Sequence, residues 1–176
     1  MMLTQDLDVG VFYASTTGNT EQIAEKIALL LGPQARCHDI SSEGFSELEN
    51  YSCVIMGIPT WDFGELQEDW AMHWDDLKKN SFNDVKVALF GLGDQIGYGE
   101  WFQDAMGQLH DQLATLGAQM IGYWPVEGYD FEASKALTED GQWFVGLALD
   151  EDGQSSLTDD RIEKWLKEVC NAFEAE

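Results

Sequence analysis

The hexapeptide Ser15-Thr16-Thr17-Gly18-Asn19-Thr20 decides how this chain is expected to fold. Before it lies a continuous apolar run over residues 9–14, which is typical of a buried β-strand. After it, apolar side chains recur at helical spacing over residues 23–31. A strand that enters a helix through such a loop gathers hydroxyls and backbone N–H groups at the helix N-terminus, where they can bind phosphate.

The loop carries no positive charge, since no Lys or Arg precedes Lys26. It lacks the Gly-Lys-Ser/Thr of triphosphate-binding loops and the Gly-x-Gly-x-x-Gly of dinucleotide sites. It also lacks the Cys and Arg with which low-molecular-weight phosphatases cleave phosphate esters. We therefore expect neutral donors to bind a phosphate without hydrolysing it. The alternative is a Ser/Thr-rich loop that only caps a helix.

Further apolar segments predict a parallel sheet that is buried on both faces. They cover residues 53–58, 85–90, 119–123 and 144–149, with a weaker strand over residues 35–40. Thr158, followed by two Asp residues, is the expected start of the last helix. Three sets of apolar residues have the spacing of one helix face: Leu66, Trp70, Trp74 and Leu77; Phe102, Met106, Leu109, Leu113 and Leu116; Ile162, Leu166, Val169 and Phe173.

This alternation of strands and helices predicts an α/β fold, in which a doubly wound parallel sheet has helices on both faces. A length of 176 residues suits one domain, over residues 1–176. The polar connection over residues 127–142 interrupts the fifth strand. We expect this connection to be an insertion within the domain.

Two other loops are expected beside the hydroxyl loop, because ligands of open α/β sheets bind beyond the carboxyl ends of the strands. They are Pro59-Thr60-Trp61-Asp62-Phe63-Gly64 and Gly91-Leu92-Gly93-Asp94-Gln95-Ile96-Gly97-Tyr98-Gly99. Each carries a large aromatic side chain, Trp61 or Tyr98. Together with the hydroxyl loop they predict a planar ring between two aromatic faces, tethered by a phosphate, as in flavin mononucleotide (FMN). For Trp61 alone, the alternative is an aromatic side chain that packs onto the core.

The chain is strongly acidic, with 33 Asp and Glu against nine Lys and Arg and a formal charge of −24. This charge would repel nucleic acid. It would attract basic protein partners, although it could instead serve solubility alone. No apolar run approaches the roughly 20 residues that span a bilayer, and the N-terminus lacks the pattern of a signal peptide. We therefore expect a cytoplasmic protein that does not enter a membrane.

Metal and disulfide chemistry are not expected from the spacing of the possible ligands. The three cysteines, Cys37, Cys53 and Cys170, are scattered and form no Cys-x-x-Cys pair. The three histidines, His38, His73 and His110, also lack the close spacing of metal ligands. These residues are expected to pack or to lie at the surface.

The sequence resembles the flavodoxin family, and in particular its long-chain bacterial members, from about residue 8 to residue 173. The resemblance rests on Ser-x-Thr-Gly-Asn-Thr at 15–20, Gly-Ile-Pro-Thr-Trp at 57–61, Gly-x-Gly-Asp-Gln at 91–95 with Tyr98 following, and Gly-Leu-Ala-Leu-Asp-Glu-Asp at 146–152. It implies a three-layer αβα sandwich with a five-stranded parallel sheet in the order 2-1-3-4-5. The insertion over residues 127–142 would split the fifth strand.

The resemblance also implies roles for single residues. Ser15, Thr17, Asn19 and Thr20 would bind the FMN phosphate, with help from the backbone of Thr16 and Gly18. Trp61 and Tyr98 would lie on either side of the flavin ring, although Trp101 offers a third aromatic. The Asp62-Phe63 peptide would turn when the flavin takes its first electron. The other residues implied in FMN binding are Pro59, Thr60, Gly64, Gly91, Leu92, Gly93, Asp94, Gln103 and Asp152.

The resemblance implies a low-potential one-electron carrier rather than an enzyme. Its partners would be a ferredoxin-NADP reductase with a basic surface and low-potential acceptor enzymes, and we expect a monomer. Charge favours the same function, because a unit charge at 4 Å is worth about 4 kcal/mol at an effective dielectric of 20, so nearby carboxylates penalise an anionic reduced flavin. Two alternatives are an FMN-dependent quinone or nitro reductase that uses NAD(P)H, and a non-redox protein that binds another phosphate.

Overall fold

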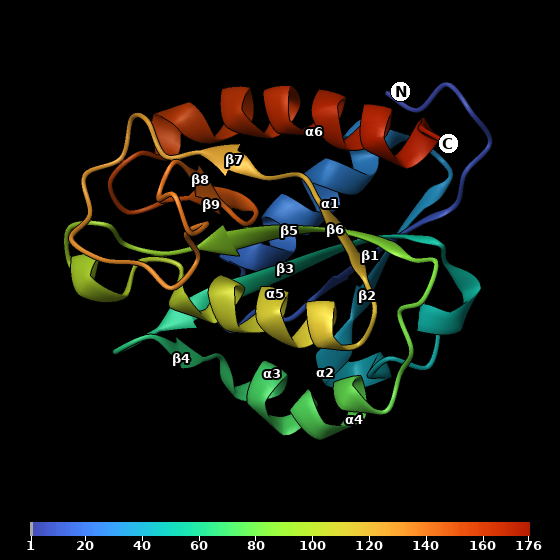
Figure 1. The fold of residues 1–176 in the computed structure, drawn as a ribbon, viewed down its shortest axis with the longest axis horizontal. Coiled ribbons are helices and arrows are strands. Elements are labelled where there is room, and N and C mark those ends of the chain that lie inside the picture. The colour runs from blue at the N-terminus through green and yellow to red at the C-terminus, as the bar shows by residue number, and fades with distance from the viewer. Residues whose placement is uncertain (1) are drawn as a thin grey trace.

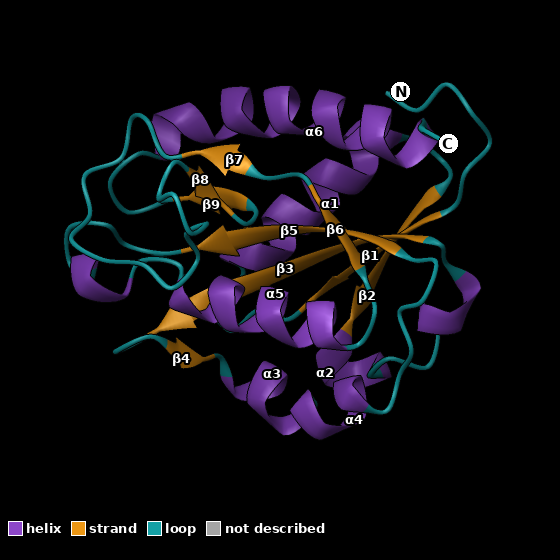
Figure 2. Cartoon of the chain, in the orientation of Figure 1, coloured by secondary structure: helices purple, strands orange, loops and turns teal. Residues whose placement is uncertain are grey.

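The computed structural model of the protein describes residues 2–176 and has a central parallel sheet (Figures 1 and 2). Its strands lie in the order β2-β1-β3-β5-β6. They are β1 (Val9–Tyr13), β2 (Ala35–Asp39), β3 (Cys53–Trp61), β5 (Lys86–Leu92) and β6 (Gln119–Ile121). The predicted α/β class and the predicted strand order 2-1-3-4-5 are both confirmed.

The fifth position in the sheet is shared by two short strands. β6 pairs in parallel with residues 86–88 of β5, and β9 (Leu147–Leu149) pairs in parallel with residues 90–92. The segment over residues 122–146 separates the two strands in sequence. The predicted interruption of the fifth strand is therefore confirmed, with the excursion somewhat longer than residues 127–142.

Helices cover both faces of the sheet, as Figure 1 shows. α1 (Asn19–Leu31) and α6 (Thr158–Glu174) pack on one face. The opposite face is covered by α5 (Asp104–Thr115) and by three short helices, α2 (Ile40–Glu43), α3 (Glu68–Met72) and α4 (Trp74–Lys78). There are also three single turns of 3-10 helix among the described residues: η1 (Leu48–Asn50), η2 (Gly99–Trp101) and η3 (Ser155–Leu157).

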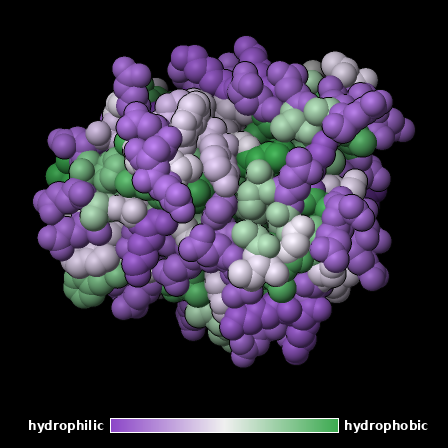
Figure 3. All heavy atoms as spheres, in the orientation of Figure 1, coloured by the Kyte–Doolittle hydropathy of each residue, from purple (hydrophilic) through white to green (hydrophobic). Residues whose placement is uncertain are grey.

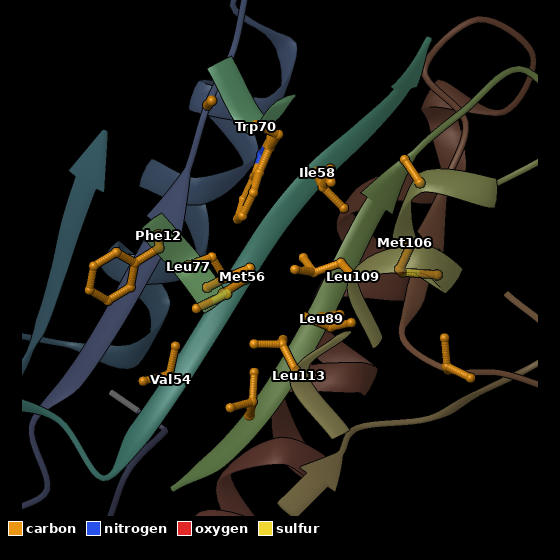
Figure 4. Packing of buried hydrophobic residues seen from close by; sticks show 14 of the residues in the cluster. Phe12, Val54, Met56, Ile58, Trp70, Leu77, Leu89, Met106, Leu109 and Leu113 are labelled. Carbon is orange, nitrogen blue, oxygen red and sulfur yellow. The ribbon is translucent and has the colours of Figure 1, made fainter. Parts of the chain in front are cut away.

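The sheet divides the core into two apolar clusters, because successive side chains of a strand point to opposite faces. In β1, Val11 lies in the cluster under α1 and α6, whereas Phe12 lies in the cluster under α5. Figure 4 shows the second cluster, in which Met56 and Ile58 of β3 lie near Trp70 of α3 and Leu109 of α5. Burial on both faces explains why these strands are continuous apolar runs in the sequence.

The single helix face predicted for Leu66, Trp70, Trp74 and Leu77 is wrong. Leu66 belongs to β4 (Glu65–Leu66), which pairs antiparallel with the end of β3. The other three residues lie on α3 and α4, which meet at His73. Gln67 explains the late start of α3, because its side chain accepts hydrogen bonds from the N–H groups of residues 69 and 70 and so caps the helix.

The predicted strand over residues 144–149 is also corrected, because Phe144 lies outside the central sheet. It belongs to β8 (Trp143–Phe144), which forms a two-stranded antiparallel ribbon with β7 (Trp124–Pro125). Its ring packs in an aromatic group with Phe102, Tyr129 and Phe131. This aromatic group belongs to the apolar cluster under α5, so the insertion packs onto the main core.

α6 begins at Thr158, as predicted, but the side chain does not cap the helix. The Thr158 hydroxyl instead donates to the Glu151 carboxylate. Asp159 and Asp160 in the first turn complement the positive end of the helix. In Figure 3, hydrophilic side chains cover α6 along the top of the face that is viewed. Within residues 2–176, no helix has the length and apolar character needed to cross a bilayer.

Candidate functional site

A cavity of about 330 Å³ lies at the carboxyl ends of β1, β3 and β5, the edge toward which the β5 arrow points in Figure 1. Its volume is in the range of ligand-binding pockets. The three loops singled out in the sequence all contribute to its walls. The predicted site residues that line it are Ser15, Thr16, Thr17, Asn19, Thr20, Pro59, Thr60, Trp61, Asp62, Leu92, Gly93, Asp94, Tyr98 and Asp152.

The hydroxyl loop places the N-terminus of α1 at one end of this cavity. Gly18 adopts a left-handed conformation, with φ of 94°, and its N–H donates to the Ser15 hydroxyl oxygen at 3.0 Å. Among the described residues 2–176, no side chain caps α1, so the positive end of the helix is left for a ligand. The Thr16 hydroxyl oxygen accepts a hydrogen bond from the Gln67 amide at 3.0 Å.

The loop after β3 makes a tight turn from Trp61 to Gly64. The Gly64 N–H donates to the Trp61 carbonyl at 3.1 Å. Asp62 has φ of 45° and Gly64 has φ of 88°, so the turn needs two left-handed residues. Asp62 is not a glycine, and it therefore adopts a conformation that few side chains favour.

The glycine-rich loop after β5 forms the opposite wall. One Asp94 oxygen accepts from the N–H groups of Ile96 and Gly97, at 3.1 and 2.8 Å. This Asx turn brings Tyr98 to the rim, where 44% of the residue is exposed. A Cβ at Gly97 would lie 2.4 Å from Asp94 Oδ2, so a larger residue there would displace the carboxylate that holds the turn.

A buried carboxylate connects this wall to the loop after β9. Asp150 is fully buried, and its Oδ2 accepts from the Gln95 side-chain amide at 2.7 Å. Its Oδ1 accepts from the N–H groups of Asp152 and Gly153, at 3.1 and 2.8 Å. The Gln95 side-chain carbonyl in turn accepts from the N–H of Asp130 in the insertion. One network thus ties together three segments around the cavity.

Comparison with known protein families shows which family the chain resembles, because the sequence profile described as Flavodoxin matches residues 11–165. This chain belongs to the flavodoxin family. The match includes all three loops around the cavity. It confirms the resemblance on which the assignments of single residues rest.

Individual flavodoxins cover nearly the whole chain. Flavodoxin 2 of Escherichia coli is 50% identical over 166 residues, which are 94% of this chain and 96% of that protein. The flavodoxin of Synechocystis is 48% identical over 163 residues, which are 92% of this chain and 95% of that protein. The solved structure of Fusobacterium nucleatum flavodoxin bound to flavin mononucleotide has a TM-score of 0.88 and 32% identity, and the match covers 94% of this chain and 98% of that one.

The cavity of this flavodoxin is electrostatically negative. Four carboxylates line it, those of Asp62, Asp94, Glu151 and Asp152, and no Lys or Arg within residues 2–176 does so. Burial raises the pKa of Asp152, and the neighbouring charges of Asp94 and Asp150 raise it further. An anionic ligand would therefore have to be bound by neutral donors.

Five predicted site residues of the flavodoxin loops do not line the cavity. Gln103 is fully buried behind the glycine-rich loop, where its amide donates to the Leu149 carbonyl at 3.1 Å. A Cβ at Gly91 would lie 2.2 Å from the Gln103 side-chain oxygen, so Gly91 makes room for it. Phe63 is 66% exposed outside the cavity. The other two, Gly18 and Gly64, occupy the turns described above.

Three residues line the cavity beyond those predicted to bind FMN, namely Trp101, Phe102 and Glu151. Trp101 could be recognised in the sequence as a third aromatic residue near Tyr98. Its ring packs edge-on against the ring of Phe63, with the two ring centroids 5.0 Å apart. Phe102 precedes α5 rather than lying on it. Glu151 lies between the two Asp residues of the motif at 146–152, so its position in that motif could have marked it as a site residue.

Proposed function

We propose that this flavodoxin binds FMN in the cavity and uses it to carry single electrons between redox proteins. The observation that supports this function best is the shared cavity: the uncapped N-terminus of α1, Trp61 and Tyr98 all line it. A ligand with a phosphate at one end and a planar ring at the other fits these walls. When bound, FMN supplies a ring that accepts and releases electrons.

The phosphate would lie against the hydroxyl loop. Ser15, Thr17, Asn19 and Thr20 would donate to it, with the backbone of Thr16 and Gly18. Because these donors are neutral, they bind the phosphate without adding a positive charge near the ring. The charge around the ring is then set by the carboxylates that line the cavity.

The ring would lie between Trp61 and Tyr98, with Asp94 at its pyrimidine edge and Asp152 near the ribityl chain. Contacts from Pro59, Thr60, Leu92 and Gly93 would complete the pocket. The left-handed conformation of Asp62 makes the Asp62-Phe63 peptide the one expected to turn toward the ring upon reduction. The backbone carbonyl of this peptide would then accept a hydrogen bond from an N–H group of the ring.

The carboxylates around the cavity favour a carrier at low potential. Negative charge on Asp62, Asp94 and Asp152 opposes the addition of an electron that leaves the ring anionic. The alternative of an NAD(P)H-dependent quinone or nitro reductase is not favoured, because the chain has no second nucleotide motif and its relatives are flavodoxins.

As a flavodoxin, the chain acts as a redox carrier between reductases and acceptors. We propose partners with basic surfaces, such as a ferredoxin-NADP reductase and low-potential acceptor enzymes, because the formal charge of −24 would steer them toward it. We further propose that the protein is a cytoplasmic monomer with one domain over residues 1–176. Electron transfer from such a reductase should slow as ionic strength rises.

Anaerobic stepwise photoreduction, followed by visible absorption, tests this function. A yellow protein whose spectrum passes through a long-lived blue stage before bleaching would support one-electron transfer. Direct bleaching in a single stage would contradict it and favour two-electron enzyme chemistry. A protein that takes up no FMN after reconstitution would contradict the assignment of the cavity.

A further inference from the structure

Gln67 lies behind the hydroxyl loop and has a fixed orientation. It is fully buried and does not line the cavity. Its side-chain oxygen accepts from the backbone N–H groups of Asp69 and Trp70, at 3.0 and 3.2 Å. Backbone N–H groups can only donate, so the oxygen of the amide must face them and its NH₂ group must face the other way.

The NH₂ group of Gln67 has two acceptors. One proton is donated to the Asp69 carboxylate at 2.7 Å, and the other to the Thr16 hydroxyl oxygen at 3.0 Å. A carboxylate can only accept, so it confirms the orientation of the amide from the second side. All four hydrogen-bonding positions around this buried amide are therefore consistent with one orientation.

This orientation determines what Thr16 can do. A hydroxyl has one proton to donate and two lone pairs that accept. Because Gln67 fills one lone pair of Thr16 from the protein side, the proton of the Thr16 hydroxyl stays free for another acceptor. Thr16 is exposed and lines the cavity at the N-terminus of α1, where the phosphate is expected.

We propose that Gln67 is a positioning residue, which orients the Thr16 hydroxyl so that its proton is donated to the phosphate of the bound ligand. The inference rests on the proposed function and adds a residue that does not touch the ligand. It explains how a loop without Lys or Arg directs its donors at an anion. It also gives the Thr16 side chain a role, where the resemblance implied only a role for its backbone.

A charge-neutral exchange tests the proposal. In the double variant Gln67→Glu/Asp69→Asn, the introduced carboxylate can still accept from the two backbone N–H groups and can accept from the introduced amide. Toward Thr16, however, it can only accept, so it takes the hydroxyl proton away from the ligand. The net charge of the chain is unchanged, and the Thr16→Val background described below separates the loss of this donor from repulsion by the relocated carboxylate.

The measurement compares FMN with riboflavin, which lacks the phosphate, by fluorescence titration of the flavin-free full chain. We expect the double variant to bind FMN at least about tenfold more weakly than the wild type, because one hydrogen bond to a charged group is lost. Riboflavin affinity should change less than twofold. In the background of Thr16→Val, the same double exchange should cause no further loss of FMN affinity.

Two results would overturn the inference: an unchanged ratio of FMN to riboflavin affinity, or an equal loss for both ligands, which indicates a structural effect. If the wild type itself binds FMN no better than riboflavin, the proposed function fails instead. If circular dichroism shows that the double variant does not fold, the single variants Thr16→Val and Thr16→Ser test the inference in the same titration. The inference requires the first to lower the ratio of FMN to riboflavin affinity about tenfold, and the second to keep the ratio of the wild type.

Discussion

Replacing Asp150 by Asn should destabilise the protein strongly, although the two side chains have the same shape. Asp150 is fully buried, and its two oxygens accept from donors on opposite sides. Oδ2 faces the side chain and the N–H of Gln95, and Oδ1 faces the N–H groups of Asp152 and Gly153. An introduced amide must point its NH₂ group at one of these pairs of donors.

The surrounding groups cannot adapt to the new donor. Gln95 cannot turn its amide over, because its oxygen accepts from the N–H of Asp130. Two hydrogen bonds to a charged group are therefore lost, and each is worth about 1.5–3 kcal/mol. Allowing for relaxation, we expect a loss of about 2–4 kcal/mol in the free energy of unfolding. For a chain of this length, that lowers the melting temperature by roughly 5–15 °C.

Urea denaturation of the flavin-free chain, followed by circular dichroism, measures this loss. The midpoint should fall while the slope of the transition stays unchanged, because the surface exposed on unfolding is the same. Asp6→Asn is the matched control, since Asp6 is exposed, and it should lie within about 0.5 kcal/mol of the wild type. If Asp150→Asn matches that control, the buried network does not hold the loops together as we argue.

Three further predictions concern other parts of the chain. Lys86→Met should lower the free energy of unfolding by about 1–2 kcal/mol in thermal melts, because the Lys86 ammonium donates to the carbonyls that end α6; an unchanged melting temperature would refute this. Asp152→Asn should stabilise the flavin-free chain at pH 7, since the raised pKa of Asp152 means that its charged form is disfavoured in the fold. That gain should vanish below about pH 4, where the wild-type side chain is also neutral, and a gain independent of pH would contradict the reasoning. Tyr98→Ala should weaken FMN and riboflavin equally, each by about tenfold in fluorescence titrations, because stacking does not involve the phosphate; a loss confined to FMN would exclude Tyr98 from the ring.

Much of the fold follows from local patterns in the sequence. Strands that are buried on both faces are continuous apolar runs in the sequence. The bounds of β1, β3 and β5 could therefore be predicted to within a few residues. The segment over residues 66–77 could not, because Gln67 caps α3 and Leu66 pairs with the end of β3. Both effects depend on residues that meet only in the folded chain. For the same reason the sequence did not separate Phe144 from β9.

The sequence by itself determined which loops form the site, because parallel strands bring their carboxyl ends to one edge. It also determined the types of donor and aromatic that line the cavity. Only the tertiary structure decided which side chains point inward and which support them from behind. Gln103 lies behind the wall, Asp150 ties the loops together, and Gln67 orients Thr16. These roles depend on hydrogen bonds between residues far apart in the chain, and such bonds leave no periodic pattern in a sequence.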